Sequence, residues 1–403
     1  MLVRMIAPAI GAICLFIGAS QARAEVPPGP GIDAAVVQLM QDTGARGIAV
    51  AVIDDGRVVY VQAYGDRNAA GDPLTTDTIM YGASLTKTVF AWSLLQLVDR
   101  GVVDLDRPVA EVLPDLPSMY DADIANRYSD WRGLAEDPRW RTITPRIALT
   151  HSTGFLNFGW MEPDERIRIH FDPGSRYAYS GDGMILLQFM LEKGLGRDVG
   201  GDIQTGIFDP LGMTNTSLIW RPDFATNLAD GWKADGAIEP HDERSKVRAA
   251  GSMDTTIHDI ALFAAALIRG DGISPAARAE MVRPQLAITT ATQFPTLQPD
   301  LPPERRRPDL QAGLGLVTFT GPQGPGFYKG GHNDSTGNTL VCLERGRRCI
   351  VILSNDVRSE AGFGDLVRTV LGESGVPYDW EYGAAHWGAG ALSGAHTKPS
   401  SLR

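Results

Sequence analysis

The sequence predicts an α+β fold: one antiparallel sheet built from both chain ends and flanked by helices, with a mostly helical lobe inserted. Strand-like runs occur at residues 48–53 and 58–63, and strand patterns return from residue 313 to residue 355. Between them, residues 105–300 combine Pro-rich loops with helical patterns such as residues 256–269. Because the strands lie at the two ends of the chain, a single shared sheet is the most economical arrangement.

The first residues have the features of an export signal. Arg4 gives a positive start, residues 5–19 are largely apolar, and Ala22-Arg23-Ala24 matches a small-x-small cleavage site. The apolar run is shorter than the roughly 20 residues that span a membrane. We therefore expect residues 1–24 to be a signal peptide whose cleavage releases the protein into the periplasm or the medium, without stable membrane insertion.

The composition is that of an acidic globular enzyme. The chain has 403 residues, of which 43% are hydrophobic and 21% charged, and its formal net charge is -11. A protein with this charge repels nucleic acid, so no nucleic-acid partner is expected. We expect a catalytic domain over residues 25–382, with an α/β lobe at about 30–100 and 310–375 and a helical lobe at about 105–300. Residues 383–403, rich in Gly, Ala and Ser, are expected to form a flexible tail.

The N-terminal elements follow in order. A Pro/Gly linker at residues 27–31 leads to a helix that ends before Gly47, and the two early strands are joined at Asp54-Asp55-Gly56, a strong hairpin signal. Residues 84–100 predict a helix ended by Gly101. Its apolar side chains cover most of its circumference, which is typical of a buried helix.

Two cysteines follow the predicted signal peptide, Cys342 and Cys349. Apolar runs on either side predict a hairpin that turns near Arg345-Gly346, which would place the two cysteines directly opposite each other. An oxidising compartment would permit a disulfide there. Two free thiols are the alternative, because so short a loop gains little from closure.

The helix at residues 84–100 opens with Ser84-Leu85-Thr86-Lys87. Residues three apart share a helix face, so the Lys87 amine can reach the Ser84 hydroxyl. A serine needs an adjacent base to attack a carbonyl carbon, and burial makes a lysine a better base by lowering its pKa. Backbone N–H groups at the helix N-terminus would face a developing oxyanion. The pattern alone also fits a capping serine and a lysine that reaches solvent.

Two further stretches stand out. In residues 171–181 a Pro-Gly turn is followed by Tyr177 and Tyr179, and Lys329-Gly330-Gly331-His332 lies within the returning strands. Glycines within a strand often indicate that something approaches the backbone closely. For residues 171–181 the alternative is a surface turn with packed tyrosines, and for residues 329–332 it is a simple β-bulge.

Together these motifs resemble a known family. Ser84-x-x-Lys87, Tyr179-Ser180-Gly181 and Lys329-Gly330-Gly331 are similar, in order and spacing, to the three motifs of class C beta-lactamases, family VIII carboxylesterases and related penicillin-binding-protein-like hydrolases. The resemblance covers most of residues 30–375. It includes residues 149–154, which are similar to the family's Leu-Thr-His-x-Ser-Gly stretch. A beta-lactamase/transpeptidase-like fold is implied.

The resemblance also implies roles for four side chains. Ser84 would be the acylated nucleophile and Lys87 its base. Tyr179 would pass the proton to the leaving group and later activate water. Lys329 would lie near the Lys87 amine and the Tyr179 phenol and help to hold the pKa values of both down.

The same resemblance implies an oxyanion and substrate-binding set. The backbone N–H groups of Ser84 and His332 would form the oxyanion hole, and Gly330, Gly331 and Gly181 would line the substrate. The His332 imidazole could also face the substrate, although the interpretation in which only its backbone matters is the simpler one.

Two positions depart from the beta-lactamase pattern. Gly181 replaces the family's Asn, which binds the acylamide of a penicillin or peptide, and Gly330 replaces a Thr that helps to hold the substrate carboxylate. Each missing hydrogen bond is worth roughly 0.5–1.5 kcal/mol. Both losses weaken recognition of a carboxylated amide and leave the acyl-transfer groups in place, which favours an ester.

No cofactor or metal is expected. The histidines lack metal-ligand spacing, and no phosphate-binding glycine loop precedes a helix. His151 is interpreted as part of a structural turn. The sequence therefore predicts a serine hydrolase that takes a small-molecule ester or amide. Its alternatives are a beta-lactamase or D-amino-acid peptidase with the same mechanism, and a noncatalytic penicillin-binding-like protein.

Overall fold

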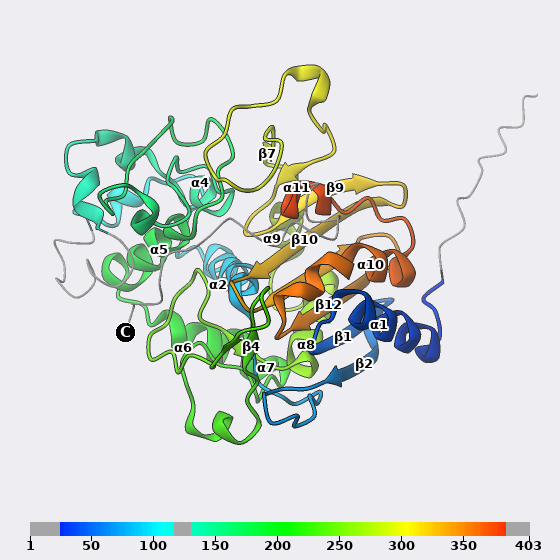
Figure 1. Ribbon diagram of the computed structural model, residues 1–403. Coiled ribbons are helices and arrows are strands. Elements are labelled where there is room, and N and C mark those ends of the chain that lie inside the picture. The colour runs from blue at the N-terminus through cyan, green and yellow to red at the C-terminus, as the bar shows by residue number, and fades with distance from the viewer. Residues whose placement is uncertain (1–24, 117–129, 384–403) are drawn as a thin grey trace, which may run out of the picture.

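The computed structural model describes residues 25–116 and 130–383 (Figure 1). The predicted signal peptide at residues 1–24 lies outside the described residues, as does all but the first residue of the predicted tail at 383–403. Both stay predictions. Among the described helices, none combines the length and the apolar character needed to cross a membrane.

The central element is an eight-stranded antiparallel sheet that uses both ends of the described chain, as predicted. The strands run, in sheet order, over Arg57–Gly65 (β2), Gly47–Asp54 (β1), Arg348–Ser354 (β12), Gly337–Leu343 (β11), Gly324–His332 (β10), Val317–Gly321 (β9), Gln311–Ala312 (β8) and Leu286–Ala287 (β7). The join between the two ends is the β1–β12 pair, in which Ile48 lies opposite Ser354. The N-terminal hairpin therefore completes a sheet whose other strands come from the last third of the chain.

Strand β1 shows why the sheet is the middle layer of the fold. Its residues are buried on both faces, and they divide by alternation. Ala49, Ala51 and Ile53 belong to one hydrophobic cluster, whereas Ile48 and Val52 belong to another. Because each face has its own core, helices must cover both sides.

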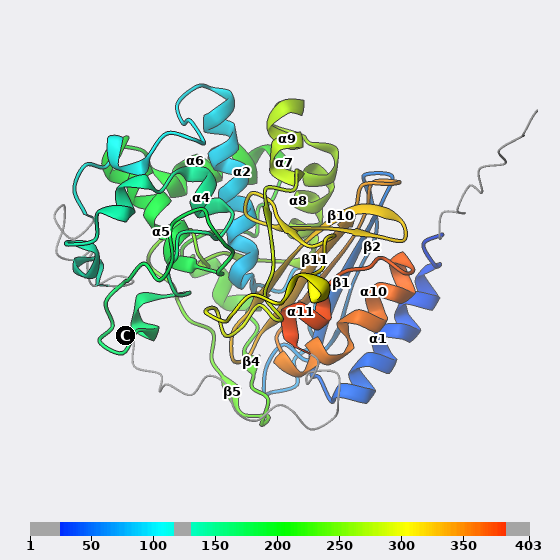
Figure 2. The same cartoon turned by 90° about the horizontal axis from the view of Figure 1, so that it is seen from above.

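Helices α1 (Gly29–Thr43) and α10 (Phe363–Leu371) lie together on one face of the sheet, and α2 (Thr86–Asp99) and α8 (Ile257–Arg269) lie on the other (Figure 2). Helix α8 begins at its cap Thr256, whose side chain accepts a hydrogen bond from the Asp259 N–H group. Helix α2 is buried around nearly its whole circumference, as its apolar composition predicts.

The remaining elements are short. The other helices are Pro145–Leu149 (α4), Gly181–Phe189 (α5), Val199–Ile203 (α6), Asp209–Leu211 (α7), Pro275–Val282 (α9) and Tyr378–Tyr382 (α11). Two small sheets pair Met80–Tyr81 (β3) with Asp254–Thr255 (β6), and Gly231–Trp232 (β4) with Ile238–Glu239 (β5). Helices α4 to α7 lie on the α2 side of the sheet (Figure 1), where α6 contacts α2, α4 contacts α5 and α7 contacts α8.

The hairpin of β11 and β12 places Cys342 opposite Cys349, and the two form a disulfide with a Cα–Cα distance of 4.1 Å. Both residues are fully buried. The structure therefore contains the disulfide and not the two free thiols that the sequence left as the alternative.

Removing this disulfide is expected to lower the stability of the fold and to leave its chemistry intact. The double variant Cys342→Ala/Cys349→Ala should lose about 2 kcal/mol in free energy of unfolding, the low end of the usual range, because the closed loop is short. Denaturant unfolding measures the loss, and peptide mapping without reductant should recover the linked pair from the wild type. Equal stability of variant and wild type would contradict this expectation.

Candidate active site

Ser84 lies in a one-turn 3-10 helix, Ala83–Leu85 (η1), that leads directly into α2. Ala83 has a φ of 46°, a left-handed conformation that is unusual for a residue with a side chain. The Thr86 hydroxyl holds this turn by donating to the Ala83 carbonyl at 2.6 Å and accepting from the Met253 N–H at 3.1 Å. Ser84 is partly exposed at the end of a buried helix.

Lys87 lies one turn further along and is 1% exposed. Its Nζ is 2.8 Å from Ser84 Oγ and donates to the Ala250 carbonyl at 2.5 Å. Burial lowers the pKa of this amine, and the charge of Lys329 lowers it further, while Tyr179 acts in the opposite direction. A neutral amine at this position can take the Ser84 proton.

Tyr179 precedes Ser180, the N-cap of α5, and is 4% exposed. Its hydroxyl accepts a hydrogen bond from Lys329 Nζ at 3.2 Å. The Nζ atoms of Lys87 and Lys329 lie 5.0 and 4.9 Å from the centre of its ring. Burial alone would raise the pKa of the phenol, but the charges of the two lysines outweigh it and lower the pKa to about 8. The structure thus brings together the four side chains predicted from the sequence.

Gly331 allows strand β10 to approach Ser84 closely. A Cβ atom on Gly331 would lie 3.2 Å from the Ser84 nitrogen and 2.9 Å from the Gly82 carbonyl oxygen. Any side chain there would crowd the space in front of the Ser84 N–H group. Pairing with β9 ends at Tyr328, so within the described part of the chain the segment after it pairs only with β11. Its other edge can offer backbone groups to a ligand.

His332 ends β10, and its side chain belongs to an ion pair. Nδ1 lies 3.1 Å from both carboxylate oxygens of Glu360, and the imidazole is 43% exposed. Partial burial disfavours the charged ring, but the Glu360 carboxylate overrides this and raises the pKa of His332 to about 9. Because side chains alternate along a strand, His332 projects to the face opposite Lys329 and Gly331. This arrangement favours the interpretation in which only the backbone of His332 reaches the substrate.

Gly181 opens α5 and packs against an aromatic ring. A Cβ atom there would lie 2.4 Å from the Phe158 ring, so no side chain fits at this position unless Phe158 moves. The Gly181 N–H group donates to the carbonyl oxygen of Asn157 at 2.8 Å. A direct contact of Gly181 with substrate stays a prediction.

His151 has a closer relation to the site than a turn alone would require. Its φ is 53°, and its Nδ1 accepts a hydrogen bond from the Ser180 N–H group at 3.1 Å. The imidazole lies against Tyr179, with ring centroids 4.4 Å apart. Burial and the neighbouring lysines keep its pKa well below the usual value, so the ring is neutral and supports the phenol by packing.

Three other groups at the site were given no role from the sequence: the Ala250 carbonyl, Glu360, and Glu381 on α11. Ala250 contributes through its backbone, which a residue type does not reveal. Both glutamates lie beyond the last motif, in segments without a catalytic pattern.

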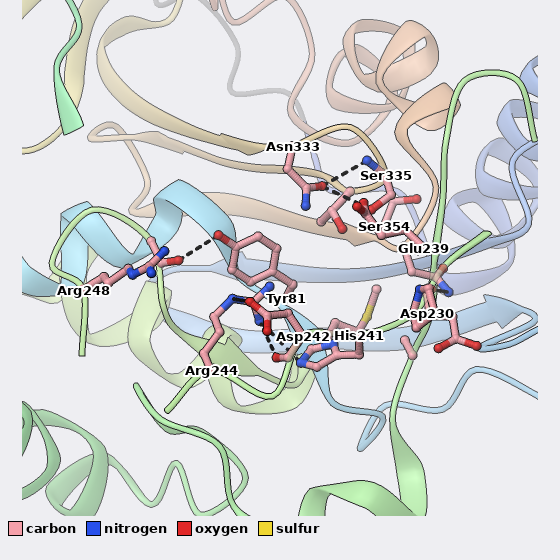
Figure 3. A pocket seen from close by; sticks show the side chains of 17 residues that line it. Tyr81, Asp230, Glu239, His241, Asp242, Arg244, Arg248, Asn333, Ser335 and Ser354 are labelled. Carbon is pink, nitrogen blue, oxygen red and sulfur yellow. Dashed lines mark hydrogen bonds and ion pairs between the residues drawn. The ribbon is translucent and has the colours of Figure 1, made fainter. Parts of the chain in front are cut away.

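A polar cavity of about 270 Å³ is lined in part by chain neighbours of the site residues, but Ser84, Lys87, Tyr179 and Lys329 are not among its lining residues. Tyr81, which precedes Ser84 by three residues, lines it together with Gly251 and Asn333. Figure 3 shows Asn333 across the cavity from Tyr81, whose ring is covered by the Arg244 guanidinium at 3.6 Å. The further side chains labelled in Figure 3 are those of Asp230, Glu239, His241, Asp242, Arg248, Ser335 and Ser354.

Among the described residues, no group of three or more histidine, cysteine, aspartate or glutamate side chains is arranged to hold a metal ion.

The family model described as "Beta-lactamase" matches residues 32–372. The chain is 28% identical over 218 residues to lovastatin esterase from Penicillium rubens, a match that covers 47% of this chain and 53% of the relative. It is likewise 28% identical over 221 residues to esterase EstB from Burkholderia gladioli, covering 50% and 54%. The matched region thus spans about half the length of these relatives.

The similarity to solved structures extends over more of the chain. A class C beta-lactamase superposes with a TM-score of 0.66 at 17% identity, covering 85% of this chain and 95% of that structure. At this identity the likeness concerns the fold.

The charges around Tyr179 predict its titration. Its phenol should be half ionised near pH 8, as phenol below that pH and as phenolate above it, because the two ammonium groups stabilise the anion. Tyrosinate absorption, followed against pH, should contain a component near pH 8 that Tyr179→Phe removes. Tyr177→Phe is the matched control, since burial raises the pKa of Tyr177 well above its usual value. A component that survives Tyr179→Phe would contradict the assignment.

Proposed function

The chain belongs to the beta-lactamase family, and we propose that it is a serine hydrolase that cleaves carboxylic esters through an acyl-Ser84 intermediate. The observation that carries this proposal is the convergence of one hydroxyl, two amines and one phenol from three distant segments. The Ser84–Lys87 and Lys329–Tyr179 contacts, at 2.8 and 3.2 Å, link these groups in pairs around the phenol ring.

In the proposed reaction the neutral Lys87 amine takes the Ser84 proton while Oγ attacks the ester carbonyl carbon. The carbonyl oxygen becomes an oxyanion that the N–H groups of Ser84 and His332 stabilise. The carbon–oxygen bond of the ester then breaks, and the alcohol leaves with a proton passed through Tyr179. In the second half, the Tyr179 proton passes to the neutral Lys87 amine, and the phenolate takes a proton from water. The resulting hydroxide attacks the acyl carbon, the bond to Oγ breaks, and Ser84 Oγ regains a proton from Lys87 as the acid leaves.

Two glycines support an ester rather than an amide substrate. Gly181 offers no side-chain amide to bind an acylamide, and Phe158 occupies the space beside it. Gly330 offers no hydroxyl to bind a carboxylate, and the Glu381 carboxyl lies there. The esterase names of two relatives agree with this preference.

The polar cavity of Figure 3 favours a second candidate function with the same chemistry. A beta-lactam or a D-amino-acid peptide carries amide and carboxylate groups that polar side chains and arginines could hold. Rapid nitrocefin turnover or release of D-alanine from a muropeptide, with little ester hydrolysis, would establish this candidate over the first.

The acyl-enzyme is directly testable. A fluorophosphonate probe or a p-nitrophenyl ester should label Ser84, as read by mass spectrometry of the digested protein. Ser84→Ala should abolish the label and lower ester turnover at least about a thousandfold, because no other group replaces the nucleophile. Ser93→Ala, on the same helix, is the matched control and should retain both.

A label that persists in Ser84→Ala would end the assignment of the nucleophile. Failure of all acyl probes to label the pure wild-type protein would support a noncatalytic penicillin-binding-like protein instead.

A further inference from the structure

Helix α11 holds a carboxyl group against the strand that carries Lys329. The helix is anchored by its own backbone and side chains: the Gln293 N–H group donates to the Trp380 carbonyl at 2.8 Å, and Trp380 Nε1 donates to Thr290 Oγ1 at 3.1 Å. Tyr378 Oη lies 3.1 Å from Thr339 Oγ1 on β11. These contacts fix α11 over the end of the sheet and determine where Glu381 points.

Glu381 occupies the space that a side chain at position 330 would need. A Cβ atom on Gly330 would lie 1.7 Å from Glu381 Oε1 and 2.7 Å from its Cδ. Such distances are far inside van der Waals contact, so the carboxyl group requires glycine at this position. Glu381 is 8% exposed, and its Oε2 has no hydrogen-bond partner among residues 25–116 and 130–383.

The same glycine also receives the catalytic ammonium group. Lys329 Nζ donates to the Gly330 carbonyl at 2.7 Å and to Tyr179 Oη at 3.2 Å. The Glu381 carboxyl and the Lys329 ammonium therefore both lie against Gly330, the carboxyl where a Cβ atom would be and the ammonium at the carbonyl oxygen. We propose that Glu381 is a positioning residue. Its carboxyl, packed against Gly330, determines how strongly the positive charge of Lys329 stabilises the Tyr179 phenolate.

The charges that face Glu381 come from two other elements. Lys329 and His332 belong to β10, and Glu360 belongs to the 3-10 helix Val357–Gly362 (η11). Burial raises the pKa of Glu381 to about 8; Lys329 and His332 lower it, and Glu360 raises it. The phenols around it have pKa values raised mainly by burial and stay neutral; they belong to Tyr177, Tyr328, Tyr378 and Tyr382.

The consequence is a coupling between two acids. Glu381 loses its proton over the same pH range as Tyr179. An ionised Glu381 offsets part of the Lys329 charge, so it opposes formation of the Tyr179 phenolate. A neutral Glu381 leaves the full Lys329 charge to stabilise the phenolate. For catalysis the inference rests on the proposed proton relay through Tyr179, but the coupling itself does not.

Replacing the carboxyl by an amide isolates this effect. In Glu381→Gln the amide matches the shape of the protonated acid and never becomes an anion. The titration midpoint of Tyr179, read by tyrosinate absorption against Tyr179→Phe in the same background, should shift to lower pH by about half a unit. The rising limb of ester hydrolysis against pH should shift in the same direction. Glu373→Gln, an exposed carboxyl on the same C-terminal segment, removes the same formal charge and should leave the midpoint unchanged.

Gly330→Ala provides a second route to the same result, because the added methyl group must displace the Glu381 carboxyl. Its Tyr179 midpoint should also shift to lower pH, and this keeps the inference testable if Glu381→Gln does not fold. A midpoint that is unchanged whenever the carboxyl is removed or displaced would overturn the inference, even if thermal stability falls. A shifted midpoint in a protein without ester turnover would support the coupling and contradict only the proposed function.

Discussion

The site depends on one electrostatic constraint: two lysine amines share a single buried phenol. Lys87 and Lys329 are both nearly inaccessible, and each lies about 5 Å from the Tyr179 ring. Two buried like charges are costly unless one group gives up its proton or an anion lies between them. The site can therefore hold a neutral Lys87 with a phenol, or a charged Lys87 with a phenolate, at the same net charge. A proton that moves between these arrangements creates no new buried charge, which is what a proton relay requires.

The fold meets this constraint by fixing each group on a rigid element. Ser84 lies in η1 and Lys87 in the first turn of α2, a helix packed on every side. Lys329 projects from β10, where it pairs with Leu340 on β11. The phenol precedes α5, where the Ser180 hydroxyl caps the helix by accepting from Gly183. The β1–β12 pair joins the N-terminal hairpin to the same sheet as β10. The segment that follows the hairpin carries Ser84 and contacts β10 through η1. Geometry set by secondary structure, rather than by loops, suits groups that must stay within hydrogen-bond distance.

Much of this could be predicted because it is local or periodic. The Asp55-Gly56 turn follows from turn chemistry, the burial of α2 from its apolar circumference, and the Cys342–Cys349 pair from the symmetry of its hairpin. The convergence of the four motif side chains came from their resemblance to a family pattern. Contacts made by the backbone or by unpatterned segments could not be predicted. The Ala250 carbonyl has no residue signature, and Glu381 reaches the site only because α11 folds back over the sheet. The short strands β7 and β8 are too brief to show alternation.

The two glycines that depart from the family pattern show why a missing side chain is not an empty space. At position 181 the space belongs to the Phe158 ring, and at position 330 it belongs to the Glu381 carboxyl, each supplied by a distant part of the chain. The Phe158 ring and the Glu381 carboxyl, which is protonated near neutral pH, differ in chemistry from the Asn amide and the Thr hydroxyl of the family pattern. The acyl-transfer groups tolerate this exchange because they project from the opposite face of β10 or from other elements. Substrate preference can therefore change through segments outside the motifs while the reacting groups keep their positions.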